Sequence, residues 1–271
     1  MKKTVIGLLI FALGFSGLAG CGNAGKATVT TDGSTSMEKT IGCLGEAFEM
    51  ETGIRVTYNP TGSGTGIQAV LDGRCDIGLS SRELKTDELQ EGLEGTVLAY
   101  DGIAILVHPD NPVSDLSRET LGAICKGEIT DWSQIGGPAG EIVLIGREAG
   151  AGTRDGFEAA IDAKGMCKYR QELTSTGDVI TTVSRNPGAI GYASIASVKE
   201  NVKVVTIDGI SPTDEHIATG SYKIRRPFIL VTKKDASLSE NARKFYDYMT
   251  SGEAEDIISF AGVVPANSVT E

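Results

Sequence analysis

Histidine and tryptophan are scarce in this 271-residue chain, which has two histidines, one tryptophan, seven tyrosines and seven phenylalanines. A serine hydrolase needs a base beside its nucleophile, and neither His108, next to Pro109, nor His216, in a polar stretch, lies in such a motif. So few aromatic residues also argue against stacking platforms for carbohydrate. The 36 acidic residues leave a pair of catalytic carboxylates open, but no flanking pattern singles one out. We therefore expect no enzyme and no cofactor.

Basic residues are outnumbered, with 25 Lys and Arg against 36 Asp and Glu, which gives a net charge of −11. Such a chain repels nucleic acid and acidic membrane surfaces, so we expect no nucleic-acid partner. It can still bind an anion where backbone donors build a local site. The 35 glycines indicate many tight turns and places where the backbone approaches something closely.

A long apolar run occurs only near the N-terminus, and it is too short to span a bilayer as a stable helix. It follows Lys2 and Lys3, extends over residues 5–15 and leads to Leu18-Ala19-Gly20-Cys21. This pattern resembles a bacterial lipobox, with an ordinary secretory signal as the alternative. We predict a lipoprotein signal peptide at 1–20, lipidation of Cys21 and a lipidated linker at 21–26. The mature protein would then be extracytoplasmic and anchored to the cell membrane by its N-terminal lipid alone.

The remaining cysteines form no C-x-x-C pair and match no zinc spacing, so we expect no metal site. They are Cys43, Cys75, Cys125 and Cys167. Export makes disulfides possible, and neighbours in the sequence would pair as Cys43–Cys75 and Cys125–Cys167. Buried free thiols are the alternative, and the sequence leaves both open.

Strand-like and helix-like runs alternate along the chain, which predicts α/β architecture with mostly parallel sheets. Met37, Ile41, Leu44 and Phe48 share one helical face, and Thr35-x-x-Glu38 is a candidate capping box for that helix. Further helices are expected near residues 67–71, 121–124, 157–161 and 242–249. The expected strands are Ala27–Thr31, Ile54–Tyr58, Thr96–Tyr100, Ile103–Val107, Ile142–Ile145, Ile190–Ala193, Val202–Ile207 and Phe228–Thr232.

Glycine and hydroxyl residues gather in three segments that each follow a strand and open a helix, at 32–37, 61–66 and 146–154. The first N–H groups of a helix lack intrahelical partners, and the helix dipole favours negative charge there. Arg147 in the third segment adds a forked guanidinium that matches an oxyanion. Most such turns only cap helices, but three of them, one with an arginine, favour a converging oxyanion site. None has the Gly-Lys-Ser/Thr of a P-loop.

The chain resembles the phosphate-binding lipoproteins of bacterial phosphate ABC importers, in the form common in Gram-positive bacteria. The matching stretches cover most of residues 27–271 in the family's order: GSTSM at 33–37, ETGIRVTYNPTGSGTGI at 51–67, CDIGLSSREL at 75–84, YDGIAILVHPDNPV at 100–113, GEITDWSQIGG at 127–137, GREAGAGTRDGFE at 146–158, NPGAIGY at 186–192 and RRPFILVT at 225–232.

The resemblance implies a two-lobed type II periplasmic-binding-protein fold (a Venus flytrap) with a mixed sheet in each lobe. Lobe 1 would comprise residues 27–101 plus 228–271, and lobe 2 residues 102–227. A monomer would capture inorganic phosphate between the lobes and deliver it to the membrane permease subunits of the importer. Carried over residue by residue, the implied phosphate ligands are Thr35, Ser36, Ser63, Arg147, Gly152 and Thr153.

Two positions depart from the family's pattern. Ser81 stands where better-known members have an aspartate, which accepts the phosphate proton and repels sulfate, so sulfate rejection is in doubt. Asp101 is the candidate replacement acceptor, with a buried structural aspartate as the alternative. Ala151 replaces a serine, which removes a hydroxyl but leaves its backbone N–H available. Arg82 is either a second cation near the cleft or a surface arginine.

Overall fold

The computed structural model describes residues 28–269. The signal peptide, Cys21 and the linker predicted from the sequence lie outside the described residues. Within 28–269, no helix has both the length and the apolar character needed to cross a membrane.

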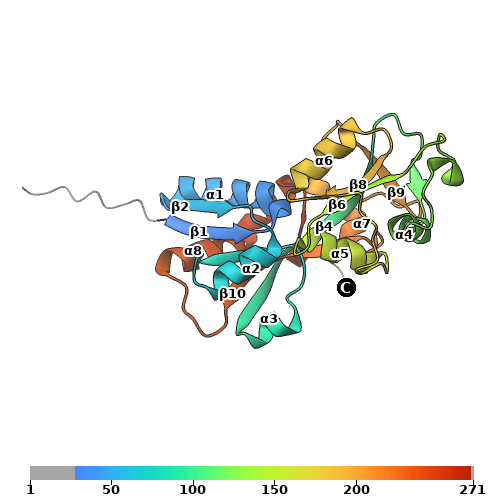
Figure 1. Cartoon of the computed structure of the whole chain (residues 1–271). Coiled ribbons are helices and arrows are strands. Elements are labelled where there is room, and N and C mark those ends of the chain that lie inside the picture. Colours follow the sequence, from blue (N-terminus) through green and yellow to red (C-terminus); the bar gives the residue numbers. More distant parts are fainter. Residues whose placement is uncertain (1–27, 270–271) are drawn as a thin grey trace, which may run out of the picture.

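The predicted α/β architecture is confirmed, with helices and strands that alternate along the chain (Figure 1). The strands are β1 (Thr28–Gly33), β2 (Arg55–Asn59), β3 (Ile77–Ser80), β4 (Leu93–Val107), β5 (Asp115–Leu116), β6 (Val143–Arg147), β7 (Gln171–Leu173), β8 (Ala189–Ser194), β9 (Lys203–Ile207), β10 (Arg225–Lys233) and β11 (Val264–Pro265). The α-helices are α1 (Glu38–Thr52), α2 (Ser63–Leu71), α3 (Thr86–Gln90), α4 (Arg118–Lys126), α5 (Gly152–Ala160), α6 (Thr176–Arg185), α7 (Asp214–Ala218), α8 (Glu240–Met249) and α9 (Glu255–Phe260).

The mostly parallel arrangement and the separate sheet in each lobe that we expected are not what the structure has, because the long strands β4 and β10 pair antiparallel and join both ends into one mixed sheet. Its order is β2-β1-β3-β10-β4-β8-β6-β7, with β11 and β9 paired to β4 and β5 paired to β9. Parallel pairs join β1 to β2 and β3 at one end, and β6 to β7 and β8 at the other. The central strands β10 and β4 are antiparallel. We expected two separate strands at Thr96–Tyr100 and Ile103–Val107, but β4 runs through both because β10 pairs with it as far as Gly102, where β8 takes over at Ile103.

Two main groups of buried apolar side chains lie at the two ends of this sheet. The first core group is Val29, Met37, Ile41, Leu44, Phe48, Ile54, Ile77, Leu79, Leu98, Ala99, Phe228, Leu230, Ala242, Phe245, Met249, Ala254, Ile258 and Val263. The second core group is Ile103, Ile105, Val107, Val113, Leu116, Leu121, Ile124, Cys125, Trp132, Leu144, Phe157, Ile161, Ala163, Ile190, Tyr192, Val205, Ile207, Tyr222 and Ile224. Along β4, the change from one group to the other falls between Ala99 and Ile103.

Helices cover both faces of the sheet, so the side chains that alternate along a strand are buried on both sides. On β10, Phe228 and Leu230 pack in the first core group with α1 and α8. The intervening Ile229 and Val231 pack on the opposite face with Ile67 and Val70 of α2. The four residues predicted to form one face of the first helix are all buried in the first core group, so that prediction is confirmed.

The cysteines of the described residues are free thiols at positions 43, 75, 125 and 167. The Cys125 and Cys167 side chains are nevertheless close enough to interact, and this interaction raises the pKa of Cys125 and lowers that of Cys167. Burial raises the pKa of Cys75 to about 12. Of the two alternatives that the sequence left open, this arrangement corresponds to the free thiols.

Candidate anion-binding site

The loops that follow β1, β2, β3 and β6 meet between the two core groups. In open α/β sheets, ligands bind beyond the carboxyl ends of the strands, where such loops gather. The first loop is fixed by its own polar groups: Tyr58 Oη donates to Ser34 O at 2.6 Å, and Asn59 Nδ2 donates to Asp32 Oδ2 at 2.8 Å. These contacts hold Thr35 and Ser36 in place at the start of the helical segment.

The capping box predicted at Thr35 is wrong. Ser34 is the residue that caps this segment, since its Oγ accepts from the Ser36 N–H at 3.3 Å. The Thr35 side chain instead faces the second half of the molecule, by which we mean residues 102–227 around the second core group. The other described residues make up the first half. The Ser36 N–H, expected to be an anion donor, is therefore engaged by Ser34.

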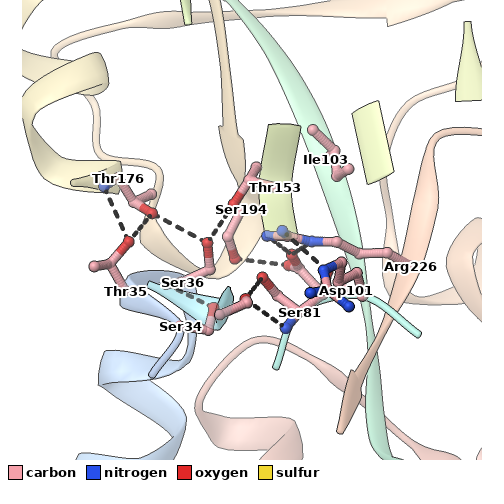
Figure 2. Close-up of polar contacts among 12 residues, drawn as sticks. Ser34, Thr35, Ser36, Ser81, Asp101, Ile103, Thr153, Thr176, Ser194 and Arg226 are labelled. Atoms are coloured by element: carbon pink, nitrogen blue, oxygen red, sulfur yellow. Dashed lines mark hydrogen bonds and ion pairs between the residues drawn. The ribbon is translucent and has the colours of Figure 1, made fainter. Parts of the chain in front are cut away.

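Four hydroxyl groups from the two halves form a buried cluster (Figure 2). Thr35 Oγ1 lies 3.1 Å from Thr176 Oγ1, and Ser36 Oγ lies 3.0 Å from the same atom. Ser36 Oγ also lies 2.9 Å from Thr153 Oγ1. Each hydroxyl can donate or accept, so the cluster can turn its protons toward an oxyanion.

Arg147 lies against this cluster and is only 1% exposed. Its Nη1 donates to Thr35 Oγ1 at 3.0 Å and to Thr176 Oγ1 at 3.3 Å. Its Nε donates to Leu173 O at 3.0 Å and its Nη2 to Thr174 O at 2.7 Å. Burial lowers the pKa of Arg147, but a guanidinium keeps its proton. The site therefore holds a fixed positive charge.

Arg147 has only neutral hydrogen-bond partners. Among residues 28–269 it forms no ion pair, whereas the buried Arg82 pairs with Glu88 at 2.6 Å and the buried Arg226 with Asp101 at 2.9 Å. Buried charges are normally paired because an uncompensated ion in a poorly solvated interior is costly. The negative charges of Glu148 and Asp178 oppose the lowering of the Arg147 pKa without forming an ion pair with it, and an anion bound next to Thr35 and Thr176 would provide a direct charge partner.

Ser63, Ser81 and Gly152 meet at the opposite side of the site. Ser63 Oγ lies 3.2 Å from Ser81 Oγ and accepts from the Ser81 N–H at 3.1 Å. A Cβ on Gly152 would lie 2.5 Å from Ser63 Oγ and 2.6 Å from Ser81 Oγ. Only glycine therefore fits at the start of α5, where the backbone comes close to both serines. Nearby, the Gly64 N–H donates to Gly150 O at 3.0 Å across the two halves.

Ala151 is buried at the N-cap of α5. Its backbone N–H donates to Glu148 O at 3.3 Å, so the donor we expected to be available is already engaged. Gly152 and Thr153 occupy the first positions of α5, where N–H groups lack intrahelical acceptors. The N–H groups of Gly152 and Thr153 are therefore better placed than that of Ala151 to donate to an anion.

Asp101 is fully buried at the crossing between the two core groups, and its partners are not the other predicted ligands. Oδ2 accepts from Arg226 Nε at 3.1 Å and Nη2 at 2.9 Å, and Oδ1 accepts from Ser194 Oγ at 2.7 Å (Figure 2). Burial raises the pKa of Asp101, and the Arg226 guanidinium and Ser194 hydroxyl oppose that rise. Asp101 is connected to Ser81 through Arg226, whose Nη1 donates to Ser81 O at 3.4 Å.

Two residues of the site did not emerge from the sequence as site residues. Thr176 is the first residue of α6 and follows Ser175, its N-cap, which is a pattern typical of an ordinary helix start. Arg226 belongs to the RRPFILVT stretch, but a charged residue in a strand-like run carries no signal of its orientation. Arg82 is buried and forms ion pairs with Glu88 and Asp155, so it is not a surface arginine.

A cavity of about 630 Å³ borders the hydroxyl cluster at Thr35 and Thr176. Lys39 from the first half and Lys199 from the second also line it. The cavity gives the cluster a route to the surface. Within 28–269, no group of three or more His, Cys, Asp and Glu side chains is placed to hold a metal ion.

Comparison with known proteins places this arrangement among binding proteins. A family model for the PBP superfamily domain matches residues 22–253. The phosphate-binding protein PstS of Borreliella burgdorferi is 30% identical over 276 residues, which cover 97% of this chain and 98% of that protein. The phosphate-binding protein PstS of Bacillus subtilis is also 30% identical, over 99% of this chain and 96% of that protein.

Solved structures of phosphate-binding proteins have the same fold as this chain. A crystal structure of a Clostridium perfringens protein with bound phosphate superposes with a TM-score of 0.85. It is 36% identical and covers 88% of this chain and 99% of that chain. An ABC-type phosphate transport receptor from Vibrio cholerae has a TM-score of 0.72, 33% identity and coverage of 87% and 99%.

Proposed function

The chain belongs to the PBP superfamily and, within it, to the phosphate-binding PstS proteins, and on this basis we propose that it captures inorganic phosphate for an ABC importer. It is an extracytoplasmic substrate-binding protein of a transport family, not an enzyme. The observation that carries the proposal is the burial of the Arg147 charge: this side chain is 1% exposed and has no ion pair within residues 28–269. Phosphate is the anion that its relatives are named for.

The phosphate would be bound between the hydroxyl cluster, Arg147 and the N-terminus of α5. The hydroxyl cluster would turn its protons toward the anion from Thr35, Ser36, Thr153 and Thr176. The hydroxyls of Ser63 and Ser81 would face it from the loops after β2 and β3. Arg147 Nη1 already points at two of these hydroxyls. The N–H groups of Gly152 and Thr153 would add donors on the positive end of the helix dipole. Ala151 would contribute contact rather than a donor.

The two core groups correspond to the two lobes of a Venus flytrap in this proposal. Lobe 1 would be 27–101 plus 228–271, and lobe 2 would be 102–227. The crossings are β4 and β10, which are antiparallel partners from Leu93 to Gly102. A hinge motion at these strands would open and close the site. The predicted ligands come from both sides, which supports closure on the anion.

The lipid anchor and the transport partner complete the proposal. Cys21 would carry the lipid and tether a monomeric binding domain beside the permease subunits of the importer. The protein would touch the membrane through that lipid only. The phosphate-loaded, closed form would be the one that docks on the permease.

Isothermal titration of phosphate into protein stripped of anions tests the binding function. We expect one phosphate per chain, no metal requirement and micromolar or tighter binding, about −8 kcal/mol or stronger. A parallel titration with sulfate measures the selectivity that Ser81 puts in question. Absence of saturable phosphate binding would overturn the proposed function.

A further inference from the structure

Arg82 is held by an acidic pocket just outside the candidate site. Its Nη1 donates to Glu88 Oε2 and to Glu83 O, both at 2.8 Å, and its Nη2 donates to Glu88 Oε1 at 2.6 Å. Its remaining nitrogen, Nε, lies 3.1 Å from Asp155 Oδ2. The Arg82 side chain is 7% exposed and that of Asp155 is 28% exposed.

The contact with Asp155 connects the two halves of the molecule. Arg82 lies two residues after β3, whose Ile77 and Leu79 belong to the first core group, and Glu88 belongs to α3, which packs against β4. Asp155 is in the first turn of α5, whose Phe157 belongs to the second core group. The ion pair therefore spans the same gap as the candidate ligands, but from outside the site.

The two facing atoms depend on each other. Arg82 Nε and Asp155 Oδ2 are buried and have no hydrogen-bond partner within the described residues, so their mutual ion pair is the compensation each receives. In the proposed hinge motion, separation of the halves would expose both atoms to water. The pair would then form only when the halves come together, and it would form readily because Glu88 already fixes the guanidinium of Arg82.

We propose that Arg82 and Asp155 are a positioning pair that holds the protein closed on its bound anion, an inference that rests on the proposed phosphate-binding function. The pair fixes the Ser81 loop against the N-terminus of α5, where Gly152 and Thr153 contact the anion. It also neutralises Asp155, whose carboxylate would otherwise repel an anion at the same helix end. Arg82 and Asp155 thereby set how long phosphate stays bound.

Stopped-flow release of phosphate from the full-length protein tests this role. Asp155→Asn is the primary variant because it leaves the Arg82–Glu88 pair intact. We expect phosphate to dissociate about tenfold faster, since losing one partner of a buried pair acts mainly on the dissociation rate. Arg82→Gln should do the same, and Arg82→Gln with Asp155→Asn should release phosphate no faster than Arg82→Gln alone.

A matched control is Arg74→Gln, which removes an exposed pair with Asp72 in the same half of the molecule. It should leave the dissociation rate unchanged. In the absence of phosphate, Asp155→Asn should melt close to the wild type, because the open protein does not use the pair. Phosphate should then raise its melting temperature less than that of the wild type.

An unchanged dissociation rate in Asp155→Asn, or strictly additive effects in the double variant, would overturn the positioning role. Wild-type protein measured in the same series separates this inference from the function itself. If the wild type binds phosphate and the variants release it at the wild-type rate, only the Arg82–Asp155 role is refuted. If the wild type does not bind phosphate, the proposed function fails first.

Discussion

Asp101 on β4 and Arg226 on β10 are direct partners across the two central antiparallel strands, and Arg226 Nη2 donates to Asp101 Oδ2 at 2.9 Å. Both side chains are at most 3% exposed. Ser194 of β8 donates to the other carboxylate oxygen. This buried ion pair lies where the chain crosses from one core group to the other, next to the Ser81 loop. It therefore links the crossing strands to the anion site.

Replacement of Asp101 by asparagine should leave Arg226 buried without its charge partner. We predict that Asp101→Asn lowers the free energy of unfolding by about 3–5 kcal/mol. It should also weaken phosphate binding, because Arg226 supports Ser81 O. The ratio of phosphate to sulfate affinity should narrow, since the asparagine amide oxygen is a weaker acceptor for the phosphate proton than the carboxylate it replaces. Denaturant unfolding and competition titrations measure these effects.

Ser81→Ala is the companion variant. Its hydroxyl can donate as well as accept, so it imposes little penalty on sulfate, and its loss should change affinity modestly with less effect on the ratio. If Asp101→Asn keeps the wild-type ratio, Asp101 is purely structural. Glu148, whose Oε1 lies 4.0 Å from a Cβ placed on Gly62, is then the next acceptor to examine.

Gly152→Ala should block closure. The added methyl group would lie 2.5 Å from Ser63 Oγ and 2.6 Å from Ser81 Oγ, which is closer than such atoms can approach. Either the two serine hydroxyls would have to leave their positions or the halves would have to stay further apart, and both changes disturb the site, so we predict at least about a tenfold loss of phosphate affinity, equivalent to about 1.4 kcal/mol. Calorimetric titration measures the loss.

Gly42→Ala provides the control for that substitution. Gly42 lies in α1, and a Cβ there meets nothing within 4 Å. Alanine should stabilise the helix by up to about 1 kcal/mol and leave phosphate affinity unchanged. Wild-type affinity in Gly152→Ala would mean that the Ser63–Gly152 contact is not part of the bound state.

Phosphate should make the protein more compact. Hydroxyl groups of Thr35 and Ser36 contact Thr153 and Thr176 across the two halves, so an anion bound by both sides favours the closed arrangement. We predict a smaller radius of gyration in solution X-ray scattering when phosphate is present. Identical scattering curves with and without phosphate would count against a hinge at β4 and β10.

Periodic and motif-rich parts of the chain were predictable from the sequence. The apolar face of α1 was evident because Met37, Ile41, Leu44 and Phe48 recur at helical spacing. The oxyanion loops were evident because glycine and hydroxyl residues stand between a strand and a helix. Arg147 stood out as the arginine in such a loop, and the structure places it beside Thr35, 112 residues away in sequence.

Features that depend on tertiary contacts were not predictable. The four-residue strand β3 was missed because it is too short for a periodic pattern. The sequence pattern predicts Thr35 as a helix cap, but its hydroxyl instead contacts Arg147 and Thr176 in the site. Thr176 and Arg226 carry no local signal, because their roles arise only when distant strands and loops are brought together.

Phosphate titration of Arg147→Ala beside wild type, with Arg147→Lys in the same series, tests the central claim most directly. A buried anion deprived of its cation partner should bind about 2–5 kcal/mol more weakly. Lysine should recover only part of the loss, because an ammonium cannot reproduce the guanidinium fork. Circular dichroism and a melting curve confirm that the variants are folded. We predict weak or undetectable phosphate binding by folded Arg147→Ala, and binding as tight as wild type would contradict a phosphate site at Arg147.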